Sequence, residues 1–169
     1  MKLHSPIKIN NKNYARGTEV PWFSIYPFFM IHMLMFGGSG FIMAYSADQV
    51  PVSFLYMHGG IAIVVYTIFY LSIFGLDEVK WMFINAGLSV LGIYSQIGWI
   101  LNYFGRDISD YPLYVHVTPF LYFVLYTFLL RHAILDITGS RENEKKKKRV
   151  EYGYVGISLA YYLASSFLT

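Results

Sequence analysis

The sequence of 169 residues contains no cysteine, which excludes disulfide bonds, thiolate metal ligands and thiol nucleophiles. Charged residues are also scarce, at 14% of the chain against roughly 25% in soluble domains. The metalloprotease motif HExxH, the phosphate-binding P-loop and the nucleophile motif G-x-S-x-G are all missing. These absences favour a protein that is not itself an enzyme.

Apolar side chains are correspondingly abundant. Hydrophobic residues make up 56% of the chain and aromatic residues 20%. A soluble domain of this length could not bury so much apolar surface, so lipid is the expected solvent for most of these side chains. The length leaves room for one domain.

Four long apolar stretches separated by short polar links predict four transmembrane helices. At about 1.5 Å per residue, each is long enough to cross a hydrocarbon core of about 30 Å. Short links make consecutive helices antiparallel neighbours. The predicted fold is therefore an all-α integral membrane protein whose up-down bundle of four transmembrane helices occupies residues 21–135. The predicted helices cover residues 21–45, 52–74, 81–103 and 111–135.

Three segments flank this bundle. Residues 1–20 form a polar cytoplasmic arm, which we expect a partner subunit to hold, and residues 136–151 are predicted to form a basic cytoplasmic loop. The apolar stretch 152–169 would span about 27 Å as a helix, so it could cross the membrane or lie at its interface. We expect a short fifth transmembrane helix, because Gly153 and Gly156 suit close helix packing.

The distribution of basic residues predicts the orientation. With the N-terminus inside, all 13 lysines and arginines except Arg106 fall on one side of the membrane. That side is then the cytoplasmic face of a plasma or inner membrane, or the equivalent face of an organellar membrane. His4 and His132 are expected at the polar boundary. The strongest topology determinants form one run: Lys145, Lys146, Lys147, Lys148 and Arg149.

The distribution of basic residues also indicates which kinds of partner the chain contacts. The basic residues flank apolar segments and form no separate recognition face. They therefore predict contact with anionic membrane lipids and not with nucleic acid.

The third predicted helix carries the largest group of polar residues within a span. Asn85, Ser89, Gly92 and Gln96 recur at spacings of four, three and four, which places them on one helix face. This stripe favours helix–helix packing, because small residues permit close approach and amides bond across the contact. The alternative is a polar pathway for protons, ions or a quinone headgroup. The GGSG sequence at residues 37–40 is likewise expected to mark a close crossing.

Two histidines within predicted spans are candidate cofactor ligands. His58 and His116 lie at similar distances from the outer membrane face, so they could face each other and supply both axial ligands of a b-type haem. Gly59 and Gly60 would leave room for the macrocycle. The alternatives are a bound metal or quinone, or hydrogen bonds from each histidine to a hydroxyl or carbonyl of a neighbouring helix. No cofactor is otherwise expected.

In outline the chain resembles the small four- or five-helix anchor subunits and b-type cytochromes of respiratory assemblies, although no motif matches residue by residue. The expected function is a non-catalytic integral membrane subunit of a larger complex, an oxidoreductase of respiratory type, which gives structural support and contacts lipids and other membrane subunits. One alternative is a small electron-transfer protein that binds b-type haem or quinone. A second is a homo-oligomeric channel or transporter.

Overall fold

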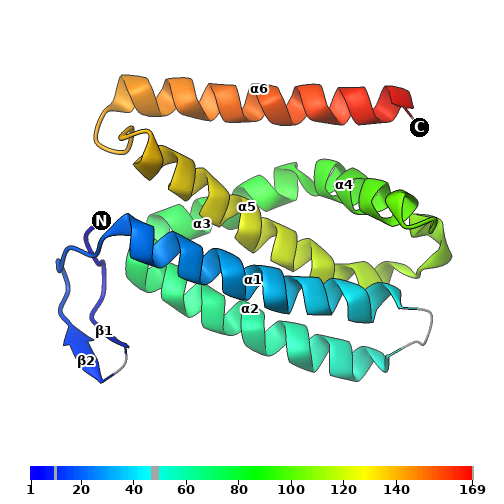
Figure 1. The fold of residues 1–169 in the computed structure, drawn as a ribbon, viewed down its shortest axis with the longest axis horizontal. Coiled ribbons are helices and arrows are strands. Elements are labelled where there is room, and N and C mark those ends of the chain that lie inside the picture. Colours follow the sequence, from blue (N-terminus) through cyan, green and yellow to red (C-terminus); the bar gives the residue numbers. More distant parts are fainter. Residues whose placement is uncertain (10, 47–49, 169) are drawn as a thin grey trace.

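The computed structural model describes residues 1–9, 11–46 and 50–168, and most of these residues are helical. A short hairpin at the N-terminus precedes six α-helices, and two 3₁₀ turns join the fourth helix to the fifth (Figure 1). The elements are β1 (Ile7–Ile9), β2 (Lys12–Tyr14), α1 (Trp22–Tyr45), α2 (Val52–Phe74), α3 (Leu76–Leu88), α4 (Val90–Tyr103), η1 (Ile108–Asp110), η2 (Leu113–His116), α5 (Val117–Ile137) and α6 (Glu144–Leu168).

Helices α1, α2 and α5 are the three long apolar helices of the bundle. Among the described residues, Ile25–Tyr45, Val52–Phe74 and Leu113–Ile137 are each long and apolar enough to cross a membrane. Half of the α5 window is buried inside the chain, against 28% for each of the other two, so α5 is the central helix. Its fully buried Leu125 and Leu129 form the middle of the core. Three helices long and apolar enough to cross a membrane are therefore present where the sequence predicts them.

The third predicted span is two helices. Instead of one helix over residues 81–103, α3 and α4 meet at Ser89 and bend by 68°, so the chain has four spans only if this pair counts as one. Gly87, Ser89 and Gly92 surround the bend, and glycine and serine are common at helix kinks. Helix α3 also starts earlier than predicted, because Gly75 ends α2 at φ 90° and α3 begins at the next residue.

The predicted basic loop is largely helical. Helix α5 ends at Ile137 and α6 begins at Glu144, so residues 145–149 occupy the first turns of α6. The side-chain oxygen of Asn143 accepts a hydrogen bond from the backbone N–H of Lys146, which caps the helix start. Lysine and arginine are good helix formers, so this run forms the start of a helix instead of a loop.

The N-terminal arm is held by the chain itself. The backbone N–H groups of His4 and Ser5 both donate to the Ser72 carbonyl in the last turn of α2, at 2.8 and 3.2 Å. Leu3 is buried in the core, and the His4 ring lies over Gly75, where a Cβ atom would be only 2.8 Å from Nδ1. The arm therefore satisfies a carbonyl that the end of a helix leaves without a partner.

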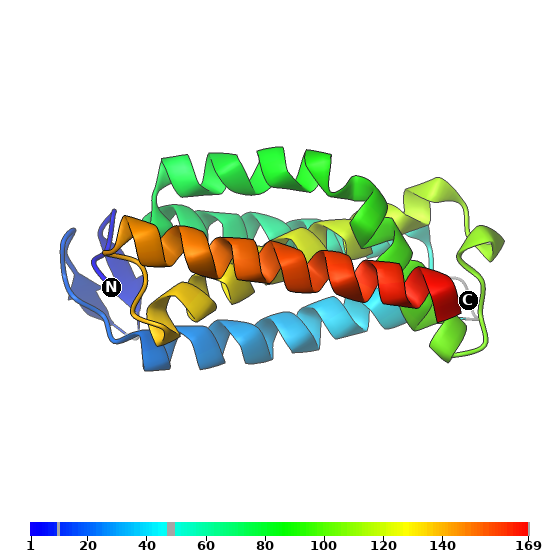
Figure 2. The same cartoon turned by 90° about the horizontal axis from the view of Figure 1, so that it is seen from above.

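The two ends of the bundle differ in charge. The N-terminal arm, the α2–α3 junction and the α5–α6 turn lie together at one end (Figure 1). Helix α6 extends from this end along the length of the bundle toward the other (Figure 2). Arg106 lies at the far end, where it donates to the Tyr45 carbonyl and the Tyr111 hydroxyl. The basic residues expected on one side of the membrane are thus gathered at one end of the molecule.

Candidate functional site

His132 lies at the centre of the most polar cluster in the described chain. It is completely buried in the last third of α5. The Phe74 ring stacks on its imidazole with centroids 4.2 Å apart, and the Phe128 ring meets it edge-on at 4.4 Å. The ring therefore packs into the core of the bundle, at the end of the molecule where the basic residues gather, and its depth relative to a membrane stays a prediction.

Both ring nitrogens of His132 face charged groups. Nδ1 lies 3.1 Å from Nη2 of Arg141, and Nε2 lies 3.5 Å from Oε2 of Glu78 and 3.4 Å from Nη1 of Arg131. A guanidinium only donates hydrogen bonds, so Nδ1 of His132 accepts from Arg141. The proton is then on Nε2, directed at Glu78, and the imidazole is neutral.

Asp136 and Arg141 form the inner part of this network. Arg141 donates from Nε to Oδ1 at 2.5 Å and from Nη2 to Oδ2 at 2.9 Å, and Tyr26 of α1 donates to the same carboxylate. The guanidinium also lies over the Phe74 ring, 5.9 Å from its centroid. Burial by itself lowers the pKa of Arg141, but the hydrogen bonds and charge interactions with Asp136 and Tyr26 together outweigh it and raise that pKa above its ordinary value.

Arg131 forms the outer part of the network. Its Nη1 atom lies 3.0 Å from Oε2 of Glu78 on α3, and its Nη2 atom donates to Glu151 on α6. Lys147 of α6 adds a longer contact of 3.7 Å to Oε1 of Glu78. This part of the network therefore ties α3, α5 and α6 together.

The charges of the network balance. Its three cations are Arg131, Arg141 and Lys147, and its three carboxylates are Glu78, Asp136 and Glu151. Buried ion pairs persist when each charge has a partner and its hydrogen bonds are satisfied. Among the described residues, no three His, Asp or Glu side chains converge as a metal site. The network joins α3, α5 and α6 and holds the Arg141 guanidinium in one orientation.

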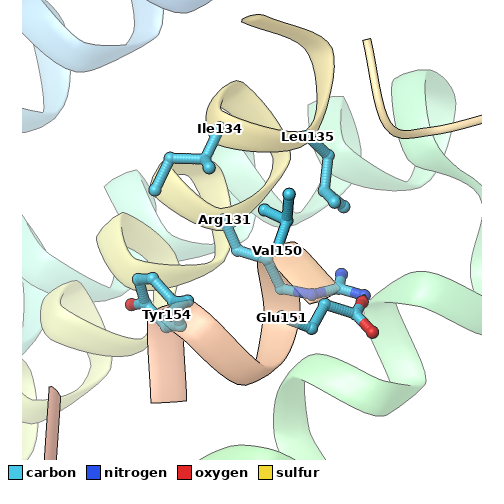
Figure 3. A pocket seen from close by; sticks show the side chains of 6 residues that line it. All are labelled: Arg131, Ile134, Leu135, Val150, Glu151 and Tyr154. Atoms are coloured by element: carbon cyan, nitrogen blue, oxygen red, sulfur yellow. The ribbon is translucent and has the colours of Figure 1, made fainter. Parts of the chain in front are cut away.

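The contact between α5 and α6 is close. Figure 3 shows the side chains around its small cavity, which has a volume of about 10 Å³. This is at the lower limit for one water molecule. The lining residues are Arg131, Ile134 and Leu135 from α5 and Val150, Glu151 and Tyr154 from α6.

A larger cavity, of about 220 Å³, lies between the N-terminal arm and the same network. The arm, the end of α2 and the α5–α6 turn each contribute to its wall. Its lining residues are Met1, Lys2, His4, Glu19, Ile73, Phe74, Arg141 and Glu142.

The predicted cofactor ligand His116 is engaged on both ring nitrogens. The Nδ1 atom lies 2.8 Å from the Tyr45 hydroxyl of α1, and Nε2 lies 3.2 Å from the Tyr111 carbonyl. A carbonyl only accepts, so Nε2 carries the proton and Nδ1 accepts from Tyr45. Of the alternatives predicted for His116, the structure therefore shows hydrogen bonds to a hydroxyl and a carbonyl.

His58 also bonds to a hydroxyl of α1. Its Nε2 atom lies 3.1 Å from Oγ of Ser39, and its ring lies beside Phe36. The space above Gly59 is filled by Thr118 of α5, whose Cγ2 atom would lie 2.2 Å from an added Cβ. Gly59 therefore allows α2 and α5 to approach closely and leaves no room there for a macrocycle.

The predicted polar stripe is interrupted. Ser89 stands at the bend between α3 and α4, so Asn85 and Gln96 lie on different helices and not on one continuous face. The Asn85 side chain is exposed, and it has no hydrogen-bond partner among the residues that the structure describes. A Cβ added at Gly92 would meet no atom within 4 Å.

The network was not predicted from the sequence, although the sequence contains a signal for it. Asp136 and Arg141 flank a turn of small residues directly after Arg131 and His132, which is a high density of charge beside a membrane span. Their partners Tyr26 and Glu78 come from distant parts of the chain. Only tertiary contacts bring these residues together.

Comparisons with known proteins assign no family to this chain. No family model matches it, and neither a curated protein nor a solved structure shows significant similarity to it. The charged network around His132, the two hydrogen-bonded histidines and the exposed amide of Asn85 are therefore the observations from which its function is inferred.

Proposed function

We propose that this chain is a non-catalytic integral membrane subunit that binds another membrane protein through the α3–α4 bend. One observation carries the proposal. The Asn85 side chain is exposed on α3, in the bent helix pair that is apolar enough to cross a membrane if it counts as one span, and no described side chain or carbonyl of the same chain bonds to it. A partner helix would supply the missing hydrogen bonds.

The depth of Asn85 makes this exposure costly. The residue lies four positions after Trp81, or about 6 Å along the helix axis, so it lies inside the apolar layer if Trp81 marks the membrane interface. Lipid chains cannot bond to an amide, and an unsatisfied polar group there costs several kcal/mol. A bond to a polar group on a second helix removes this cost.

The surroundings of Asn85 also suit a helix contact. A Cβ added at Gly87 or Gly92 would meet no atom within 4 Å, so another backbone can approach closely on this side. Gln96 of α4 provides a second amide without a hydrogen-bond partner in the described chain. Two amides and two glycines beside a bend form a surface on which a partner helix would pack.

The test replaces Asn85 by leucine. Wild-type protein extracted in mild detergent is expected to migrate on a native gel as a complex, and Asn85→Leu is expected to migrate as the free chain with unchanged helix content. Asn102→Leu is the matched control, because Asn102 lies next to the end of α4, where water is available. A wild-type chain that stays monomeric with no co-purifying protein would contradict the proposal.

Two further measurements define the complex. Mass spectrometry of the co-purified chains separates a hetero-complex from a homo-oligomer of this chain. Visible absorption of the intact complex shows whether the partner carries haem or another redox cofactor, as an assembly of the respiratory type would.

A further inference from the structure

The cavity of about 220 Å³ beside the N-terminal arm has an apolar floor and a charged rim. The floor is made by Ile73 and Phe74 at the end of α2, which are both buried in the core. The charged side chains of the rim are two cations and two carboxylates: Lys2, Arg141, Glu19 and Glu142. The N-terminal ammonium of Met1 also lines the cavity and donates to the Val20 carbonyl. A cavity with this lining suits a ligand that carries both signs of charge next to an apolar part.

Arg141 is the fixed cation of the rim. Its Nε and Nη2 atoms are bound to Asp136, and Nη2 also lies within hydrogen-bond distance of Tyr26 and His132. Its Nη1 atom has no hydrogen-bond partner among the residues that the structure describes, and 28% of the side chain is exposed. The network therefore holds the guanidinium in place and leaves one edge able to bind a phosphate.

The other charged side chains of the rim are available to bind a ligand. Lys2 and Glu19 approach only to 3.9 Å, and their side chains are 73% and 75% exposed. Such a surface pair contributes little energy and is readily replaced by contacts to a ligand. Glu142 is exposed and makes no ion pair within the described chain. Carboxylates of this kind accept hydrogen bonds from an ammonium group.

The position of the cavity indicates what would occupy it. The cavity lies where α2 ends and α3 begins, and the exposed Trp22 and Trp81 lie at the same end of the bundle. Tryptophan is enriched at membrane interfaces, so this end lies at the level of lipid headgroups. The wall made by the arm is fixed by backbone hydrogen bonds from Leu3 to Thr18 and from His4 to Ser72.

We propose that this cavity binds the headgroup of a zwitterionic phospholipid with a primary amine, of the phosphatidylethanolamine class. Arg141 and Lys2 bind the phosphate, and Glu142 and Glu19 accept hydrogen bonds from the ammonium group. The acyl chains then extend from the cavity into the surrounding lipid. A choline headgroup has no N–H to donate, so it satisfies only the phosphate half of the site.

The test measures lipid retention by native mass spectrometry. The full-length protein in detergent is mixed with equal amounts of phosphatidylethanolamine, phosphatidylcholine and phosphatidylglycerol. Wild-type protein is expected to retain the ethanolamine lipid preferentially. Glu142→Gln is expected to lower the ratio of ethanolamine to choline lipid by about threefold, the size typical of losing one exposed charged contact. Lys2→Gln is expected to weaken all three lipids together.

Matched variants control for charge and folding. Glu144→Gln removes the same charge two residues away, outside the cavity lining, and Lys8→Gln removes a cation from β1. Both are expected to retain lipids as the wild type does, and circular dichroism confirms that each variant is folded. Equal retention of the three lipids by wild-type protein, or equal effects of Glu142→Gln and Glu144→Gln, overturns the proposal. This measurement does not depend on a partner at Asn85, so either proposal can fail alone.

Discussion

Arg141 and Asp136 lie on either side of the α5–α6 turn, and the guanidinium of Arg141 bonds to both oxygens of the Asp136 carboxylate. This two-point geometry fixes orientation as well as distance. The Asp136 side chain is only 10% exposed, so no bulk water replaces the pair when it is broken. The pair holds together the end of α5 and the turn that leads into α6.

Replacing Arg141 by glutamine should destabilise the protein by about 3 kcal/mol, because a largely buried carboxylate then loses its cation. Unfolding in a detergent–denaturant titration measures this change. Arg149→Gln is the control, since Arg149 is exposed in α6 and should change stability by less than about 0.5 kcal/mol. A loss of similar size in both variants would show that the pair is not important for stability.

Two adjacent glycines of α2 should respond differently to the same substitution. Gly59→Ala places a methyl group 2.2 Å from Cγ2 of Thr118, so α2 and α5 must separate, at a cost of about 1–3 kcal/mol. Gly60→Ala meets no atom within 4 Å and should be neutral or stabilising by up to about 1 kcal/mol. Thermal unfolding in detergent compares the two variants, and equal effects would contradict the observed crossing.

The hydrogen bonds of His58 and His116 predict that the isolated chain binds no haem. Iron coordination would require these nitrogens to give up partners such as Tyr45 and Ser39. Protein purified after mild extraction and incubated with haemin should therefore show no Soret band of a bis-histidine haem. A band in the wild type that disappears in His58→Ala and His116→Ala would restore the electron-transfer alternative.

Topology can be tested directly, because the chain has no cysteine of its own and each introduced thiol is unique. An impermeant maleimide added outside intact cells should label Ser109→Cys, in the loop near Arg106, and should not label Lys12→Cys or Glu142→Cys. A cysteine added after residue 169 should also react from outside if α6 crosses the membrane. Labelling of Lys12→Cys and Glu142→Cys from opposite sides would exclude the proposed orientation.

The sequence by itself determined the presence of long apolar helices, the extents of α1 and α2, and the gathering of basic residues at one end. These features follow from local composition, because runs of apolar residues define spans and lysines stop them. The end of α5 was also predicted within two residues, whereas its start lies six residues later than predicted, after η2. The 13 basic residues mark the ends of the apolar segments, because lipid excludes charged side chains regardless of the detailed packing.

Only the tertiary structure decided where the polar side chains inside the bundle find their partners. Tyr26 and Asp136 meet across 110 residues, and Glu78 and Arg131 across 53. The bend at Ser89 is also a property of the folded chain, since an apolar run of that length reads as one helix. Charges beside lipid must be neutralised by neighbours in space, and a linear pattern does not reveal which neighbours those are.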